Sequence, residues 1–348
     1  MPALPSTQPQ TMHRFLLITR PIVAAVALVA ASAAHAQFFK DPALEAMYIA
    51  DRVADLEKAG AGRLSAKADD AQAVLAFAIA ALRGGNSADD GARRKAAIGH
   101  AETCVQRQPQ AAACHYALGT VLGVQAMSEG MLKAASSVGR VKDSLAQALA
   151  LDGQWFPARS ALTEFYLVAP GMLGGSTSKA KELAKGAANA EQARALEARV
   201  LIASGKPEAA LQLLAQVKSG GDRALSDDVA GWTYSAGITL VNEDQAERAR
   251  APFERLLRER PEDPSAAWGL ARVQAEAGAH AEAIKLFNGL AAHTAAERFP
   301  IAYRVGISQQ ALGQKEQARA AFTKFVAAGK GSKKALEDAK ERLEKLGA

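Results

Sequence analysis

The fold is decided by the stretch Gly278-Ala-His-Ala-Glu-Ala283-Ile-Lys-Leu-Phe287, whose pattern returns as Gly313-Gln-Lys-Glu-Gln-Ala318-Arg-Ala-Ala-Phe322. One repeat earlier, Ala249 and Phe253 stand at the same four-residue spacing, and Pro261 follows eight residues after the phenylalanine. The alanine-to-alanine steps are 34 and 35 residues, which is the period of a unit of two helices. Such a unit cannot bury its apolar face alone, so the pattern predicts stacked helix pairs.

The rest of the chain after Gln37 also has a helical pattern. Apolar residues return at three and four, helix-forming residues dominate, and glycine and proline fall between the periodic stretches. The repeat pattern resembles the tetratricopeptide repeat family. This resemblance implies an all-α, right-handed solenoid of helix pairs. We expect a leading helix over about 42–59, seven pairs, and a closing helix over about 332–346.

Residues 1–36 have the organisation of a cleaved export signal. Arg14 and Arg20 precede the apolar run Ile22–Ala31, and the triplet Ala34-His35-Ala36 forms an A-x-A cleavage site. We therefore predict cleavage between Ala36 and Gln37 and export to the periplasm, with secretion as the alternative. The apolar run is shorter than the about 20 residues that span a bilayer, and no later stretch predicts a membrane span. Met12 is a second candidate start.

The mature chain is expected to consist of irregular repeats over 37–190, regular repeats over 191–330 and a capping helix over 331–348. Removal of the signal leaves 40 basic and 36 acidic side chains, a net charge of +4. This mild charge gives no reason to expect a nucleic-acid partner. In the first part, the repeat over 111–151 is longer than standard, and an insertion over 169–178 separates helices expected at 155–168 and 179–188.

This insertion reads Ala169-Pro-Gly-Met-Leu-Gly-Gly-Ser-Thr-Ser178. Together with Cys114-His-Tyr-Ala-Leu-Gly119, it resembles a Pro-Gly-x-x-Gly-Gly-Ser segment in a group of uncharacterised bacterial exported repeat proteins, which implies a shared architecture and no activity. Exposed amides at a helix start can hold an anion, and the candidates for such a site are Gly174, Gly175, Ser176 and Lys179. The alternative is a tight connection whose serines cap the helix and whose lysines are solvated.

Cys104 and Cys114 are the two cysteines of the chain and lie on either side of Pro109. A disulfide between the end of one helix and the start of the next is expected in an oxidising periplasm. One alternative adds His100 and His115 as a Cys₂His₂ metal site. Neighbouring residues on a helix point about 100° apart, which argues against Cys114 and His115 facing one ion. The other alternative is two small buried thiols.

Catalytic signatures are missing from the sequence, including G-x-S-x-G, H-E-x-x-H, C-x-x-C and the phosphate-loop spacing. We therefore predict a non-catalytic scaffold that binds proteins and needs no cofactor or metal. Two alternatives stay open. One is a small-ligand or anion-binding protein that uses the loop over 171–181, and the other is an accessory subunit of an envelope enzyme complex.

In the tetratricopeptide family, the first helix of each pair lines a concave surface. The resemblance assigns six residues to inward positions on it: Tyr116, Arg199, Tyr234, Trp268, Arg272 and Tyr303. Aromatic faces with interleaved arginine suit a peptide segment or an amphipathic helix of a partner. The alternative is that these aromatics pack between helices. The basic clamp of chaperone-binding relatives is not expected, because Gln192, Ser265 and Pro300 occupy its positions.

Overall fold

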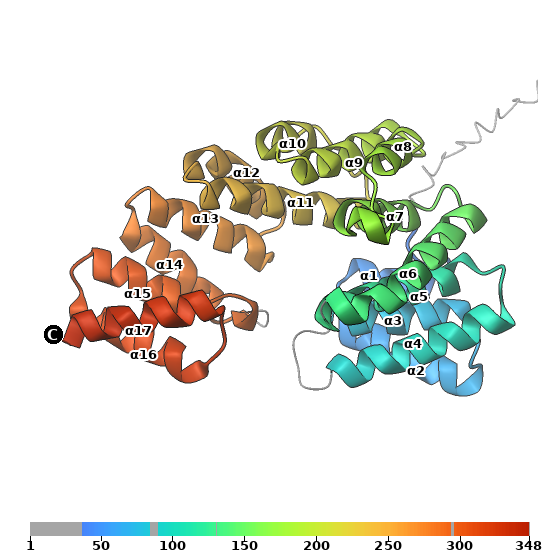
Figure 1. Cartoon of the computed structure of the whole chain (residues 1–348), viewed down its shortest axis with the longest axis horizontal. Helices are drawn as coiled ribbons and strands as arrows, with labels where there is room; N and C mark the ends of the chain where they lie inside the picture. Colours follow the sequence, from blue (N-terminus) through green and yellow to red (C-terminus); the bar gives the residue numbers. More distant parts are fainter. Residues whose placement is uncertain (1–36, 84–89, 130, 294–295, 348) are drawn as a thin grey trace, which may run out of the picture. The chain divides into compact units, whose positions relative to one another are not determined.

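The computed structural model describes residues 37–347 except 84–89, 130 and 294–295, so the predicted export signal lies outside the described residues. In this part of the chain, every regular element is a helix. None of the described helices is long and apolar enough to cross a membrane. The expected all-α helical repeat solenoid is confirmed (Figure 1).

Seven helix pairs follow two leading helices within the described residues. We call the first helix of each pair its A helix and the second its B helix. From α3 to α11, each A helix contacts its own B helix and the next A helix. The pairs are α3 (Ala71–Arg83) with α4 (Asp90–Arg107), α5 (Ala112–Glu129) with α6 (Met131–Leu151), α7 (Phe156–Val168) with α8 (Thr177–Lys185), α9 (Ala190–Ala203) with α10 (Pro207–Leu214), α11 (Arg223–Asn242) with α12 (Ala246–Glu259), α13 (Pro264–Glu276) with α14 (His280–Leu290), and α15 (Ile301–Ala311) with α16 (Lys315–Ala328).

Phe253 on the B helix α12 explains why the A helices carry glycine. Its side chain is fully buried, and its ring contacts Gly237 on α11 and Gly269 on α13. A Cβ atom at these glycines would come within 2.5 and 2.3 Å of ring carbons. Phe322 on α16 meets Gly306 on α15 in the same way, at 2.8 Å. A larger residue would push the helices apart, because protein interiors have no spare volume.

The turns between the A and B helices of the last four pairs share one residue with a left-handed backbone. The φ angle is 70° at Gly205, 80° at Gly278 and 72° at Gly313, and Asp244 takes the same place with a φ of 60°. Glycine enters this region without a steric penalty, and aspartate is among the few other residues that tolerate it. The recurring glycine of the sequence pattern is therefore the point where the chain reverses.

The leading segment differs from the single helix expected over 42–59. It forms α1 (Pro42–Ile49) and α2 (Val53–Ala66), which are separated at Asp51, whose φ is 52°. A left-handed residue does not continue a right-handed helix. The break lets each helix bury its own apolar side chains, including Tyr48 on α1 and Leu56 on α2.

The irregular pairs and the cap agree with the sequence. The helices α5 and α6 have 18 and 21 residues, and a short 3-10 helix, η1 (Gly171–Leu173), lies in the insertion between α7 and α8. A second 3-10 helix, η2 (Ala296–Arg298), precedes α15. The closing helix α17 (Lys333–Gly347) buries Ala339 and packs its leucines against Phe322 and Phe325, so it covers the apolar face of the last pair.

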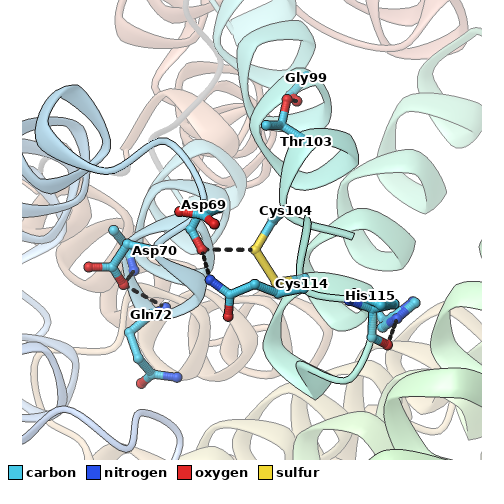
Figure 2. The surroundings of a disulfide bond; sticks show 11 residues. Asp69, Asp70, Gln72, Gly99, Thr103, Cys104, Cys114 and His115 are labelled. Carbon is cyan, nitrogen blue, oxygen red and sulfur yellow. Dashed lines mark hydrogen bonds between the residues drawn. A yellow bond between two sulfur atoms is a disulfide. The ribbon is translucent and has the colours of Figure 1, made fainter. Parts of the chain in front are cut away.

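Cys104 near the end of α4 and Cys114 near the start of α5 form a disulfide, with their Cα atoms 5.6 Å apart (Figure 2). His115 makes a separate contact, with its Nε2 atom 2.9 Å from the carbonyl oxygen of Pro109. His100 packs edge-on against a phenylalanine ring at 5.3 Å. The four side chains of the alternative metal site are thus engaged elsewhere. No group of three or more metal-ligating side chains gathers in the described part of the chain.

The Phe253 contact predicts that Gly269→Ala lowers the free energy of unfolding by about 1–3 kcal/mol, because the new methyl group overlaps the ring. Gly99→Ala on α4 is the matched control, since a Cβ atom there meets nothing within 4 Å. We expect this control to raise stability by up to about 1 kcal/mol through helix propensity. Urea unfolding followed by circular dichroism measures both effects, and equal stabilities of the two variants would contradict the packing argument.

Loss of the disulfide is expected to lower the free energy of unfolding by about 2–3 kcal/mol. The reason is that the cross-link restricts the unfolded chain over a separation of 10 residues. Urea unfolding with and without reductant measures the effect, and the double variant Cys104→Ala/Cys114→Ala should not respond to reductant. Two free thiols in the unfolded, non-reduced protein would show that the bond does not form.

Candidate functional site

A pocket of about 340 Å³ lies between the A helices α11 and α13 and is bounded by the segment that precedes α15. Tyr234 from α11, Trp268 from α13 and Phe299 supply its aromatic walls, and Arg298 supplies a positive charge. Gly231, one turn before Tyr234, also lines it. Two of the six residues predicted for the inward surface, Tyr234 and Trp268, therefore lie together at this pocket.

Core packing fixes the aromatic walls. Trp268 is 4% exposed, and its ring stacks on Phe299 with centroids 4.9 Å apart. The ring centroid of Trp268 also lies 5.2 Å from that of Phe287. Tyr234 is half-buried, and its ring centroid lies 6.4 Å from that of Phe253. A ligand would meet a preformed surface here, which reduces the entropy lost on binding.

Arginine side chains surround Tyr234. Arg298 is exposed at the pocket and makes no ion pair with any described residue. Arg272 lies one turn after Trp268 on α13 and is 7% exposed. Its Nη2 atom donates to the side-chain oxygen of Asn242 at 3.2 Å. Burial, together with the positive charge of Arg304, lowers the pKa of Arg272 to about 10. The cation of Arg272 is therefore poorly stabilised by the protein itself.

The chain's own N-terminal segment covers the predicted contact Tyr116. Phe38 is 6% exposed and packs edge-on against Tyr116 on α5, at a centroid distance of 5.7 Å, and stacks on Tyr48 at 4.5 Å. Tyr48 in turn lies 3.5 Å from the carboxylate of Asp227 on α11, which also pairs with Arg83 at 2.6 Å. Tyr116 therefore packs between segments of this chain, which agrees with the alternative that the predicted contact residues pack between helices.

Arg199 and Tyr303 are also engaged within the chain. Arg199 on α9 forms two hydrogen bonds to the carboxylate of Glu164 on α7, at 2.6 and 2.8 Å. The Tyr303 hydroxyl on α15 donates to Asp338 on α17 at 2.8 Å. Among the residues predicted for the inward surface, only Tyr234 and Trp268 therefore line a described pocket.

The glycine-rich loop uses the amides that were candidates for an anion site. The backbone N–H groups of Gly174, Gly175 and Ser176 donate to carbonyl oxygens of the preceding segment at 2.8–3.1 Å. The Ser176 hydroxyl caps α8 by accepting from the Lys179 amide at 3.3 Å. A Cβ atom at Gly175 would lie 1.8 Å from the carbonyl oxygen of Ala169. The loop is thus a tight, capped connection, and these three amides are not free for an anion.

Arg298 and Phe299 are the residues that sequence analysis missed. They lie in the connection between α14 and α15, outside the positions that recur in each repeat. The available signal is weak: an aromatic residue stands directly before Pro300, in a linker whose other residues are alanine or polar. Repeat register alone does not identify such a residue.

Two family models agree on the type of repeat. Family models described as tetratricopeptide repeat match residues 240–299 and 302–328. No curated protein matches the chain. The matched residues include the second half of the pocket, from α13 to Phe299.

Solved structures of similar fold share little sequence with this chain. A tetratricopeptide repeat protein from Parabacteroides merdae is 18% identical, with 74% of this chain and 94% of that one covered and a TM-score of 0.42. Human IFIT1, solved as a dimer with PPP-AAAA, is 16% identical, with 79% of this chain and 63% of that one covered and a TM-score of 0.52. Cut9, solved in an APC/C hetero-tetramer with Hcn1, is 13% identical, with 87% of this chain and 54% of that one covered and a TM-score of 0.50. The repeat matches and the helix pairs together identify the chain as a tetratricopeptide repeat protein.

Proposed function

We propose that the protein is a non-catalytic scaffold that binds a peptide segment or helix of a partner protein on its A helices. The observation that carries this proposal is the pocket between α11 and α13, where fixed aromatic side chains lie beside the exposed Arg298. Aromatic and arginine side chains dominate the hot spots of protein interfaces. Cut9, which has a similar fold, was solved in an assembly with another protein.

We also propose that the protein acts in the periplasm after cleavage between Ala36 and Gln37, with secretion as the alternative. The support is the basic segment, apolar run and A-x-A triplet of residues 1–36. The disulfide between Cys104 and Cys114 is compatible with an oxidising compartment. Mass spectrometry of the protein released by osmotic shock would find an N-terminus at Gln37, and an uncleaved cytoplasmic protein would contradict the proposal.

No specific observation favours either alternative function, the anion-binding protein or the accessory subunit of an envelope enzyme complex. The amides that were candidates for an anion site are used within the loop, and an accessory role in an envelope enzyme complex has no described feature of its own. The absence of nucleic-acid partners stays a prediction, since IFIT1, a protein of similar fold, was solved with PPP-AAAA. The partner-binding proposal is therefore the one to test first.

Photo-crosslinking from the pocket tests the scaffold function in intact cells. Glu297 directly precedes Arg298 of the pocket lining, and its side chain is 70% exposed, so p-benzoylphenylalanine at this position should leave the fold intact and the pocket open. We expect ultraviolet light to produce a discrete adduct with a partner protein, which mass spectrometry identifies. The same residue at Gly99, an exposed and open position on α4, is the matched control.

An adduct at position 297 that is absent at position 99 would support partner binding at the pocket. No adduct at position 297, or the same adducts at both positions, would contradict it. Circular dichroism of both variants must show unchanged helical content for the comparison to count.

A further inference from the structure

Two arginines near the pocket, Arg272 and Arg304, have too few hydrogen-bond and ion-pair partners to balance their charges. Arg272 on α13 and Arg304 on α15 share one carboxylate, that of Glu276, at 3.8 and 4.0 Å. These distances are too long for direct hydrogen bonds. The Nε atoms of both arginines are buried and have no hydrogen-bond partner in the described part of the chain. A buried guanidinium donor without a partner is costly. The side chain of Arg304 is 24% exposed and that of Arg272 is 8% exposed, so an incoming anionic group would reach the pair through Arg304.

The pocket and the arginines have a fixed spacing. Trp268 and Arg272 are four residues apart on one helix, so their side chains leave the same face about one turn, or 6 Å, apart. An extended peptide advances about 3.3 Å per residue, and side chains two residues apart point to the same side. Residues i and i+2 of an extended ligand therefore match the distance from the pocket to Arg272.

We propose that this surface recognises an extended acidic segment of a partner protein, in which an apolar side chain enters the pocket and a carboxylate two residues away pairs with Arg272 and Arg304. The proposal rests on the proposed scaffold function and names the chemistry of its ligand. Arg298 and Asp263 both line the pocket, so their charges balance, and the positive charge that selects the carboxylate comes from Arg272 and Arg304. This arrangement differs from recognition of a C-terminal carboxylate, because Ser265 and Pro300 occupy positions of that clamp.

A peptide fits this surface better than a nucleic acid does. Binding of single-stranded nucleic acid depends on aromatic faces that are open to bases. The ring of Trp268 stacks on Phe299, and the residue is 4% exposed. Tyr234 is half-buried, so the pocket offers walls for one side chain and no platform for successive bases.

Selection from a random heptapeptide library on phage tests the proposal with the full mature chain. Gly231→Trp serves as the counter-selection target, because it fills the pocket from an exposed position where a Cβ atom is unhindered. We expect enriched peptides to carry an apolar residue and Asp or Glu two positions apart. Enriched peptides without an acidic residue would overturn this inference and leave peptide binding standing. No enrichment over Gly231→Trp would count against both proposals.

Titration of one enriched, fluorescein-labelled peptide then assigns the contact. Arg272→Met, and exchange of the peptide's Glu for Gln, should each weaken binding by roughly 10- to 100-fold, as loss of a charge-assisted hydrogen bond predicts. Arg258→Met on α12 is the matched control, because Arg258 is exposed, is outside the pocket and makes no ion pair with a described residue. If Arg272→Met loses its helical circular dichroism, the peptide exchange tests the same contact in the unchanged protein.

Two results would overturn the proposal at this stage. One is equal affinity for the Glu and Gln peptides. The other is displacement of the peptide by 5′-phosphorylated tetra-adenylate at a lower concentration than by unlabelled peptide, which would identify the surface as a nucleic-acid site.

Discussion

The contact between a B-helix phenylalanine and the A-helix glycines controls the spacing of the C-terminal helices. The ring of Phe253 contacts both Gly237 and Gly269, so one side chain joins an A helix, its own B helix and the next A helix. The left-handed residue of each turn then brings the B helix back onto its A helix. The pocket depends on this spacing because Tyr234 and Trp268 lie on the same two A helices, α11 and α13.

The A helices are used differently along the chain. Around α5, the N-terminal segment supplies Phe38 as a partner for Tyr116, and Asp227 ties Tyr48 and Arg83 to α11. Around α15, the closing helix supplies Asp338 as a partner for Tyr303. Between these regions, the aromatic residues of α11 and α13 border a pocket, together with Phe299 of the segment before α15. Internal partners thus satisfy the inward side chains at α5 and α15 and leave a pocket at α11 and α13.

Periodicity was sufficient to predict the helix pairs, the long α5 and α6 and the cap, because each follows from apolar spacing and turn residues. It was insufficient where one residue or one loop decides the structure. The leading helix breaks at Asp51 because of a single left-handed φ angle. The amides of Gly174 and Gly175 donate hydrogen bonds to carbonyl groups whose positions cannot be predicted from the sequence. Phe299 reaches the pocket from a connection that has no repeat register.

The two arginines of the predicted inward surface show how one repeat position can be fully paired in one helix pair and only partly satisfied in another. Arg199 and Arg272 take the same expected position, yet Arg199 has a bidentate carboxylate partner in Glu164, whereas Arg272 has one amide oxygen within hydrogen-bond distance and a distant carboxylate. Natural sequences are locally consistent except where function imposes a cost. The unsatisfied guanidinium of Arg272 lies one turn from the pocket, so the unfavourable electrostatics and the available volume occur at the same place. Their coincidence on α13 is the physical basis for our proposal that a ligand binds there.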